Sequence, residues 1–254
     1  MATRSMPQSV ATREHRFFLY SAIAMAAVLV AGFSLNLAAG RSSFALPLVY
    51  HVHGLVFLGW IALYVTQTAL VAGRALHWHR RLGWLALIWL PVMVTLAIAI
   101  TLHAVRDHGG PPVFDVNSFL IGNPAGILTF ALLTGAAIAL RRRTDWHRRL
   151  MFCAMAAITG PGFGRLLPMP FLIPWGWWIA ALIAPSIFPI LGAIADWRRT
   201  GRVHVAWAWG WGFFVAMFLL AELFAYSSAG MALTHAVIDG TPGAARPIKA
   251  FFPQ

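Results

Sequence analysis

The sequence predicts an all-α fold, a polytopic transmembrane helical bundle with seven spans. Two features of the composition lead to this prediction: 60% of the 254 residues are hydrophobic and 10% are charged. In soluble domains about a quarter of all residues are charged and nearly one half are apolar. The third observation is a series of apolar segments that are each long enough to cross a bilayer. These segments leave no room for a separate soluble domain.

A hydrocarbon core of about 30 Å requires about 20 predominantly apolar residues per helix. The predicted spans are residues 17–39, 47–72, 83–105, 118–140, 150–167, 174–195 and 204–226. The first span is longer than the apolar region of a typical signal peptide and six more follow it, so we interpret it as membrane-spanning rather than cleaved. The fifth span is the least regular, because it contains three glycines together with Pro161 and Arg165.

The basic residues predict the orientation, because Lys and Arg accumulate in cytoplasmic loops. With the N-terminus inside, fourteen arginines lie on the cytoplasmic side: Arg4, Arg13, Arg16, Arg74, Arg80, Arg81, Arg141, Arg142, Arg143, Arg148, Arg149, Arg198, Arg199 and Arg202. The opposite side has Arg41, Arg106, Arg246 and Lys249. The sequence therefore predicts an N-in, C-out protein of a bacterial-type plasma membrane. Its parts are a cytoplasmic segment 1–16, a transmembrane domain 17–226 and a loosely ordered external tail 227–254.

The net charge of +12 does not indicate a nucleic-acid partner. The basic residues are divided among four short cytoplasmic segments instead of gathering on one face. The lipid bilayer is the predicted partner, and other membrane subunits are a further hypothesis. The single cysteine, Cys153, argues against a disulfide framework or a thiolate-rich zinc site. A retinal protein requires a lysine within a span, whereas the single lysine here is Lys249 in the tail.

The chain contains an internal repeat. Residues 78–84 (WHRRLGW) and 146–152 (WHRRLMF) share five consecutive identities, and residues 197–199 resemble a third, degenerate copy. Each complete copy lies in a cytoplasmic turn and opens an outward-going helix, which favours one leading helix followed by three parallel helical hairpins. We interpret the histidines near these turns as solvated or lipid-facing: His77, His79, His147 and His204.

Ionisable groups inside a bilayer are costly, so each one is a functional hypothesis. Arg165 and Glu222 are the two that lie deep in the predicted spans. A helical rise of about 1.5 Å per residue places both in the outer third of the membrane. Four more polar residues reach the same layer from the external ends of their spans: His51, His53, His103 and Asn123. We therefore predict a polar site in the outer half of the bundle.

Helical phase selects the residues of this site. His53 shares a face with Phe57, Trp60 and Tyr64, whereas His51 points about 160° away. The predicted site residues are His53, Trp60, Tyr64, His103, Arg165 and Glu222. Two simpler interpretations stay open: a structural ion pair of Arg165 with Glu222, and histidines that contact lipid headgroups. Asn123-Pro124 and Gly160-Pro161 are expected to interrupt two helices at matching depths.

Three motifs resemble those of a known family. Residues 51–54 (HVHG), 79–83 (HRRLG) and 147–151 (HRRLM) are similar to the HxHG, HRRLG and HxRLM motifs of a family of uncharacterised His-rich bacterial multi-pass membrane proteins. Arg165-Leu166 resembles the arginine that follows the last motif in that family. The resemblance covers roughly residues 48–167 and implies a topology rather than a reaction. The two tiers of histidines are also similar, in pattern only, to haem-carrying membrane proteins of the cytochrome b561 type.

The first functional hypothesis is a redox or cofactor-binding membrane protein. His53 and His103 would be the axial ligands of a b-type haem, whose potential depends on the ligands and on the polarity around them. Arg165 would neutralise a propionate, and Trp60 and Tyr64 would line the ring.

The second hypothesis is a proton-coupled transporter. Arg165 would bind an anionic group and Glu222 would exchange a proton, since burial and a nearby arginine act in opposite directions on a carboxyl group. The third hypothesis is a non-catalytic membrane subunit or assembly factor whose polar residues hold helices together. The sequence leaves open whether the protein is an enzyme.

Overall fold

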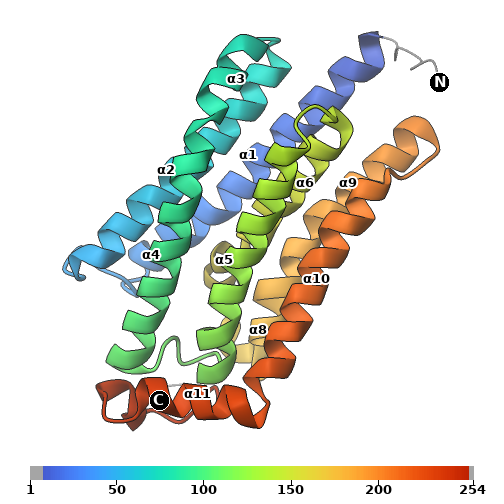
Figure 1. Cartoon of the computed structure of the whole chain (residues 1–254). Helices are drawn as coiled ribbons and strands as arrows, with labels where there is room; N and C mark the ends of the chain where they lie inside the picture. Colours follow the sequence, from blue (N-terminus) through green and yellow to red (C-terminus); the bar gives the residue numbers. More distant parts are fainter. Residues whose placement is uncertain (1–7, 252–254) are drawn as a thin grey trace.

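The computed structural model describes residues 8–251 as a bundle of long helices packed side by side (Figure 1). In this part of the chain, six helices are long and apolar enough to cross a membrane. They are α1 (Gln8–Ala38), α2 (Leu48–Ala72), α4 (Leu85–His108), α5 (Val116–Ala139), α10 (Val205–Ala225) and the continuous run of α8 (Gly176–Trp178), η2 (Ile179–Ile183) and α9 (Ala184–Thr200). The described residues contain no strand. The prediction of an all-α fold built on membrane-length helices is confirmed.

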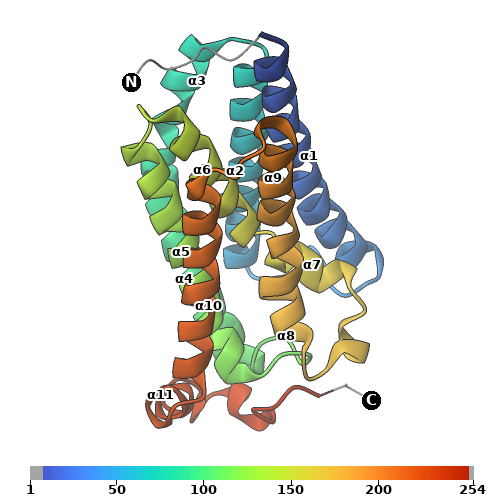
Figure 2. The same cartoon turned by 90° about the vertical axis from the view of Figure 1, so that its right-hand side faces the viewer.

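The predicted fifth span is two shorter helices, α6 (Thr144–Ala157) and α7 (Gly160–Leu166). The chain leaves α6 at Ile158 and Thr159, where the Thr159 hydroxyl donates to the carbonyl of Ala156 at 2.7 Å. Pro161 follows in the first turn of α7, where its missing N–H costs no helical hydrogen bond. Neither helix reaches spanning length by itself. In Figure 2, however, the run from α6 through α7 leads from one end of the bundle toward the other.

Three other prolines lie inside continuous helices: Pro91 in α4, Pro124 in α5 and Pro189 in α9. At Asn123-Pro124, α5 continues although Pro124 has no N–H to donate, whereas Gly160-Pro161 coincides with the start of α7. Instead, a π-helical turn, η2, directly precedes Ala184 and Pro185. Such turns absorb an extra residue and are frequent at functional sites.

The two ends of the bundle differ in composition. The end that carries α3 (Leu76–Gly83), the start of α6 and the end of α9 holds the arginine-rich turns, and we call it the basic end. At the opposite end, α11 (Ser228–Ile238) lies across the bundle and is followed by η3 (Pro242–Ala245), so we call it the capped end (Figure 1). The tail is thus helical and packed in the described residues, and the prediction of a loosely ordered extension is wrong.

The first helix begins earlier than predicted. α1 starts at Gln8, so residues 8–16 belong to it, while residues 1–7 lie outside the described part. The polar first turns of α1 remain helical because Glu14 is buried against arginines of α6 and α9. Ion pairing at the end of the bundle thus extends the helix beyond its apolar segment.

The main core contains two of the predicted site residues, Trp60 and Tyr64, which are both buried. Trp60 packs edge-on against Phe130 at 5.1 Å between ring centroids. Beside this core, α7 approaches α1 through glycines, since a Cβ on Gly32 would lie 2.5 Å from the carbonyl oxygen of Gly162. This close approach places the Arg165 side chain of α7 against the surface of α1.

Candidate functional site

The six predicted site residues all lie on helices, and they have different neighbours in the structure. Among residues 8–251, no hydrogen bond or ion pair links any two of them. Arg165 and Glu222 in particular do not pair. Glu222, His103, Arg165 and His53 are therefore described one by one.

Glu222 lies near the capped end of α10 with its side chain buried. Its Oε1 accepts a hydrogen bond from Trp177 Nε1 at 2.9 Å, and its Oε2 lies 3.2 Å from the Ser118 hydroxyl. In the described structure, no cation lies within ion-pair distance of this carboxyl. The carboxyl is therefore held by neutral donors from α5 and α8.

A chain of polar groups leads outward from Glu222. The Ser118 hydroxyl lies 3.2 Å from Tyr226 Oη, and Tyr226 donates to Asp115 Oδ2 at 2.7 Å. The same Asp115 oxygen accepts from Lys249 Nζ at 2.9 Å, and the Lys249 side chain is 73% exposed. Consecutive hydrogen-bonding distances thus connect a buried carboxyl to the surface of the capped end.

The outer members of this chain have shifted pKa values. Burial opposes ionisation of Asp115, but hydrogen bonds from Tyr226, Lys249 and the Ala250 N–H outweigh it and lower the pKa of Asp115 below its ordinary value. Burial, together with the hydrogen bond to Asp115, raises the pKa of Tyr226 to about 12. Tyr226 is therefore a neutral O–H donor at physiological pH, and Asp115 is a carboxylate.

The C-terminal segment holds this end closed. The guanidinium of Arg246 donates to carbonyl oxygens of the loop between α4 and α5: those of Gly109, Gly110, Pro111, Pro112 and Phe114. Two backbone hydrogen bonds, from Val116 to Ile248 and from Phe251 to Pro112, fix the segment beyond Arg246. We call residues 246–251 the strap. Sequence reasoning missed it, because one arginine in a polar, Gly/Pro-containing tail carries no periodic signal.

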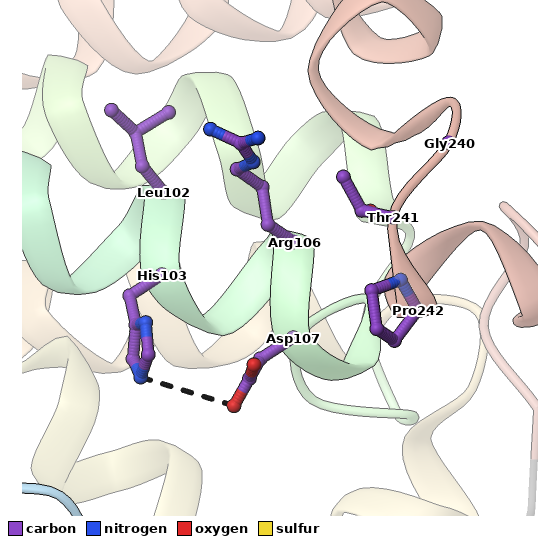
Figure 3. A pocket seen from close by; sticks show the side chains of 7 residues that line it. All are labelled: Leu102, His103, Arg106, Asp107, Gly240, Thr241 and Pro242. Carbon is purple, nitrogen blue, oxygen red and sulfur yellow. Dashed lines mark ion pairs between the residues drawn. The ribbon is translucent and has the colours of Figure 1, made fainter.

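His103 lines a recess at the surface of the capped end. The recess has a volume of about 490 Å³ and is formed by Leu102, His103, Arg106, Asp107, Gly240, Thr241 and Pro242. Figure 3 shows His103 beside Asp107, with Arg106 pointing away from that pair. His103 Nε2 lies 3.8 Å from Asp107 Oδ2, and its ring meets that of Tyr50 edge-on at 5.6 Å.

Arg165 lies on α7 and contacts α1. Its Nη1 donates to the carbonyl of Pro161 at 2.8 Å, and its guanidinium lies 4.0 Å from the ring centroid of Phe33. His53, on α2, stacks on Phe57 at 4.1 Å between ring centroids. Four of the predicted site residues have a buried nitrogen with no hydrogen-bond partner in the described structure: His53 Nδ1, Trp60 Nε1, His103 Nε2 and Arg165 Nε.

A second buried cluster of charges lies at the basic end. We call it the basic-end network, and it consists of Glu14, Asp145, Arg148, Arg149, Asp196, Arg199 and Trp207. Arg149 binds Asp196 with two parallel hydrogen bonds of 2.8 and 2.9 Å, and Trp207 Nε1 donates to the same carboxylate at 2.8 Å. Arg148 reaches Glu14 at 2.8 Å, and Arg199 reaches Asp196 at 2.6 Å.

The basic-end network joins α1, α6, α9 and α10, and sequence reasoning missed it. The arginines were interpreted only as signals of topology. A usable signal exists in the acids: the chain has seven Asp and Glu residues in all, and three of them fall beside the arginine-rich turns. Acids placed there are expected to pair with the arginines.

The histidines of the two repeat copies meet at this end. The rings of His79 and His147 lie 6.2 Å apart between centroids, and both side chains are half-buried. His147 Nδ1 lies 2.8 Å from the carbonyl oxygen of Ala137. Burial, together with His147, lowers the pKa of His79. The interpretation of these two histidines as solvated or lipid-facing is therefore wrong.

The residues available for a metal or a cofactor are few. Within the described ranges, no group of three or more His, Cys, Asp and Glu side chains is placed to hold a metal ion. Comparison with known proteins finds no match, since no family model, no curated protein and no solved structure matches the chain.

Proposed function

We propose that this chain is a proton-coupled carrier of the plasma membrane, with seven crossings and a cytoplasmic N-terminus. The six long apolar helices support a membrane protein. The seventh crossing would be made by α6 and α7 together, because α5 ends at the basic end and α8 begins at the capped end. Broken helices at membrane depth are tolerated where protein or a cavity surrounds them, and they are frequent in transporters.

The orientation follows from the basic end. Its exposed arginines outnumber the basic residues of the capped end, and positively charged loops favour the cytoplasmic side. The capped end would then face outward, with Glu222 reached from the external side.

The observation that supports proton exchange is the chain of hydrogen bonds between Glu222 and Asp115. When Glu222 is ionised, the single hydrogen of Ser118 can point to Oε2. When Glu222 is protonated, its O–H can donate to Ser118, which then donates to Tyr226. Both protonation states therefore keep their hydrogen bonds, and rotation of two hydroxyls links the buried carboxyl to Asp115, which is paired with the exposed Lys249.

The proposal is tested by current measurements on reconstituted protein. A step in pH on one side of a supported membrane should displace charge in the wild type, and Glu222→Gln should abolish this current. Asp239→Asn is the matched control, because Asp239 is an acid at the same end whose side chain is 67% exposed. An unchanged current in Glu222→Gln, or a wild-type current no larger than that of protein-free membrane, would contradict proton exchange at Glu222.

A second candidate is a bound redox cofactor such as a b-type haem, held by His53, His103, Arg165, Trp60 and Tyr64, with Glu222 nearby in depth. The unpartnered ring nitrogens of His53 and His103 favour it. Against it, the His53 ring is stacked on Phe57 and the His103 ring is engaged by Tyr50 and Asp107. The absorbance spectrum of protein expressed with haem supplied decides between the two candidates. A Soret band that is lost in His53→Ala would support the cofactor. The absence of a Soret band in the wild type would rule the cofactor out.

A further inference from the structure

Arg165 has no acidic partner among the residues that the structure describes. The sequence contains seven acidic residues, and all seven are described. Three belong to the basic-end network, while Asp107, Asp115 and Asp239 face His103, Lys249 and His235. The seventh, Glu222, is held by Ser118 and Trp177. Arg165 is thus a half-buried cation that none of the seven acids pairs with.

This charge is placed where isolation is costly. Arg165 is half-buried on α7 against the apolar helix α1, and a charged group among apolar helices normally pairs or marks a ligand site. Its contacts with the Pro161 carbonyl and the Phe33 ring stabilise the cation without neutralising it. A structural role alone would be served as well by an apolar side chain.

One edge of the guanidinium makes no hydrogen bond within the described structure. Nη1 is used by the Pro161 carbonyl, whereas the buried Nε has no partner in the described structure, and no hydrogen bond from Nη2 occurs there. Nε–H and Nη2–H are parallel donors, and this edge matches two oxygens of a carboxylate or phosphate.

We propose that Arg165 binds an oxyanion, a carboxylate or phosphate group, through its Nε and Nη2 edge. That this oxyanion is the substrate of the carrier rests on the proposed function. Binding of the oxyanion itself does not involve Glu222. The oxyanion has two sources. Phe33 is 42% exposed, so the site lies near the lipid-facing side of α1 and is open to a lipid headgroup as well as to a small solute.

The test measures the thermal stability of purified, delipidated protein with three probes: inorganic phosphate, succinate and a short-chain phosphatidylglycerol. A ligand that binds the folded state raises the unfolding temperature with its concentration. The wild type should respond to at least one probe. Arg165→Gln should weaken the apparent affinity for that probe by roughly tenfold or more, because a charge-assisted pair of hydrogen bonds is lost.

Two further variants separate charge from geometry and from general effects. Arg165→Lys keeps the charge but cannot present two parallel donors, so its affinity should fall between those of wild type and Arg165→Gln. Arg41→Gln is the matched control, an exposed arginine at the same end, and it should respond as the wild type does. Without any anion, Arg165→Gln should be at least as stable as the wild type, which shows that the variant folds.

The outcomes are distinct. A response to phosphatidylglycerol alone assigns the site to lipid, and a response to phosphate or succinate assigns it to a solute. No response of the wild type to any probe, or equal responses in wild type and Arg165→Gln, overturns the inference. Glu222→Gln should leave the response unchanged, so a failure of proton exchange and a failure of anion binding can be told apart.

Discussion

The two ends of the bundle treat buried charge in opposite ways. At the basic end, Glu14 and Asp196 are each surrounded by arginines at distances of 2.6 to 3.6 Å. Toward the capped end, Glu222 is held by a hydroxyl and an indole, and the guanidinium of Arg165 faces no acid. α10 contributes to both regions, through Trp207 and Glu222, and the regions differ in how their charges are paired.

This comparison indicates where the protein is fixed and where it can respond. A charge that is paired with its opposite in a buried site cannot change without a large loss of stability. A carboxyl held by neutral donors can gain or lose a proton with its hydrogen bonds intact, and an unpaired guanidinium can accept an anion. We therefore expect substitutions at the basic end to affect folding. Substitutions of Glu222 and Arg165 are expected to affect proton exchange and ligand binding.

The largest effect is expected for Asp196→Asn. This change removes the carboxylate that binds Arg149, Arg199 and Trp207 and leaves buried guanidinium groups unpaired. The loss of unfolding free energy should be about 3–5 kcal/mol, measured by SDS titration of the protein in mixed micelles. Asp145→Asn is the control within the same network, because its side chain is 56% exposed and the expected loss is less than about 1 kcal/mol. Equal losses in the two variants would contradict the assignment of the network as a buried lock.

The next effect concerns the strap. Arg246→Ala removes the hydrogen bonds to the carbonyl groups between α4 and α5 and leaves those groups unsatisfied. We expect a loss of about 2 kcal/mol and faster amide exchange in α11 and residues 246–251, measured by hydrogen–deuterium exchange with mass spectrometry. Arg41→Ala, at the same end, should leave the exchange rates unchanged. Protection of α11 that survives Arg246→Ala would show that apolar packing alone holds the tail.

Much of the fold could be predicted from hydropathy. Backbone polar groups within a membrane must form hydrogen bonds inside their own helix, so each long apolar segment is expected to be a helix. Six of the seven predicted segments correspond to long apolar helices of the structure. The segment 150–167 differs because Thr159 and Pro161 end one helix and begin another within the same apolar stretch. Hydropathy averages over such a break and does not detect it.

The contacts between the candidate site residues could be predicted less well than the helices. Depth along a helix is readable from residue number, and it places Glu222, His103 and Arg165 in the same layer. Which of them touch depends on the rotation and order of helices, which composition does not specify. The partners that matter for Glu222 are Ser118, a common residue without periodic signal, and Trp177, which resembles an interfacial aromatic residue.

A smaller effect on stability is expected at Glu222 itself. Glu222→Gln keeps an acceptor for Trp177 and a partner for Ser118, so unfolding free energy should change by less than about 1 kcal/mol. Glu14→Gln is the contrasting variant at the basic end, where the same chemical change removes the charge that faces three arginines and should cost several times more. Comparable losses in the two variants, measured by SDS titration, would remove the distinction between the ends.

The smallest effect is the pH dependence that Asp115 contributes. Its folded pKa lies below the ordinary value of 3.8, because hydrogen bonds from Tyr226, Lys249 and Ala250 outweigh burial. A group whose pKa is depressed by folding stabilises the folded state above its unfolded pKa, and this contribution is lost as the pH falls through the folded pKa. Asp115→Asn should therefore be less stable than the wild type at neutral pH, and the difference should shrink below pH 3.8. Lys249→Gln removes one of the three partners and should give part of the effect. A difference between wild type and Asp115→Asn that is constant across this range would mean that the charge of Asp115 does not hold the strap, and that its side chain acts there by shape alone.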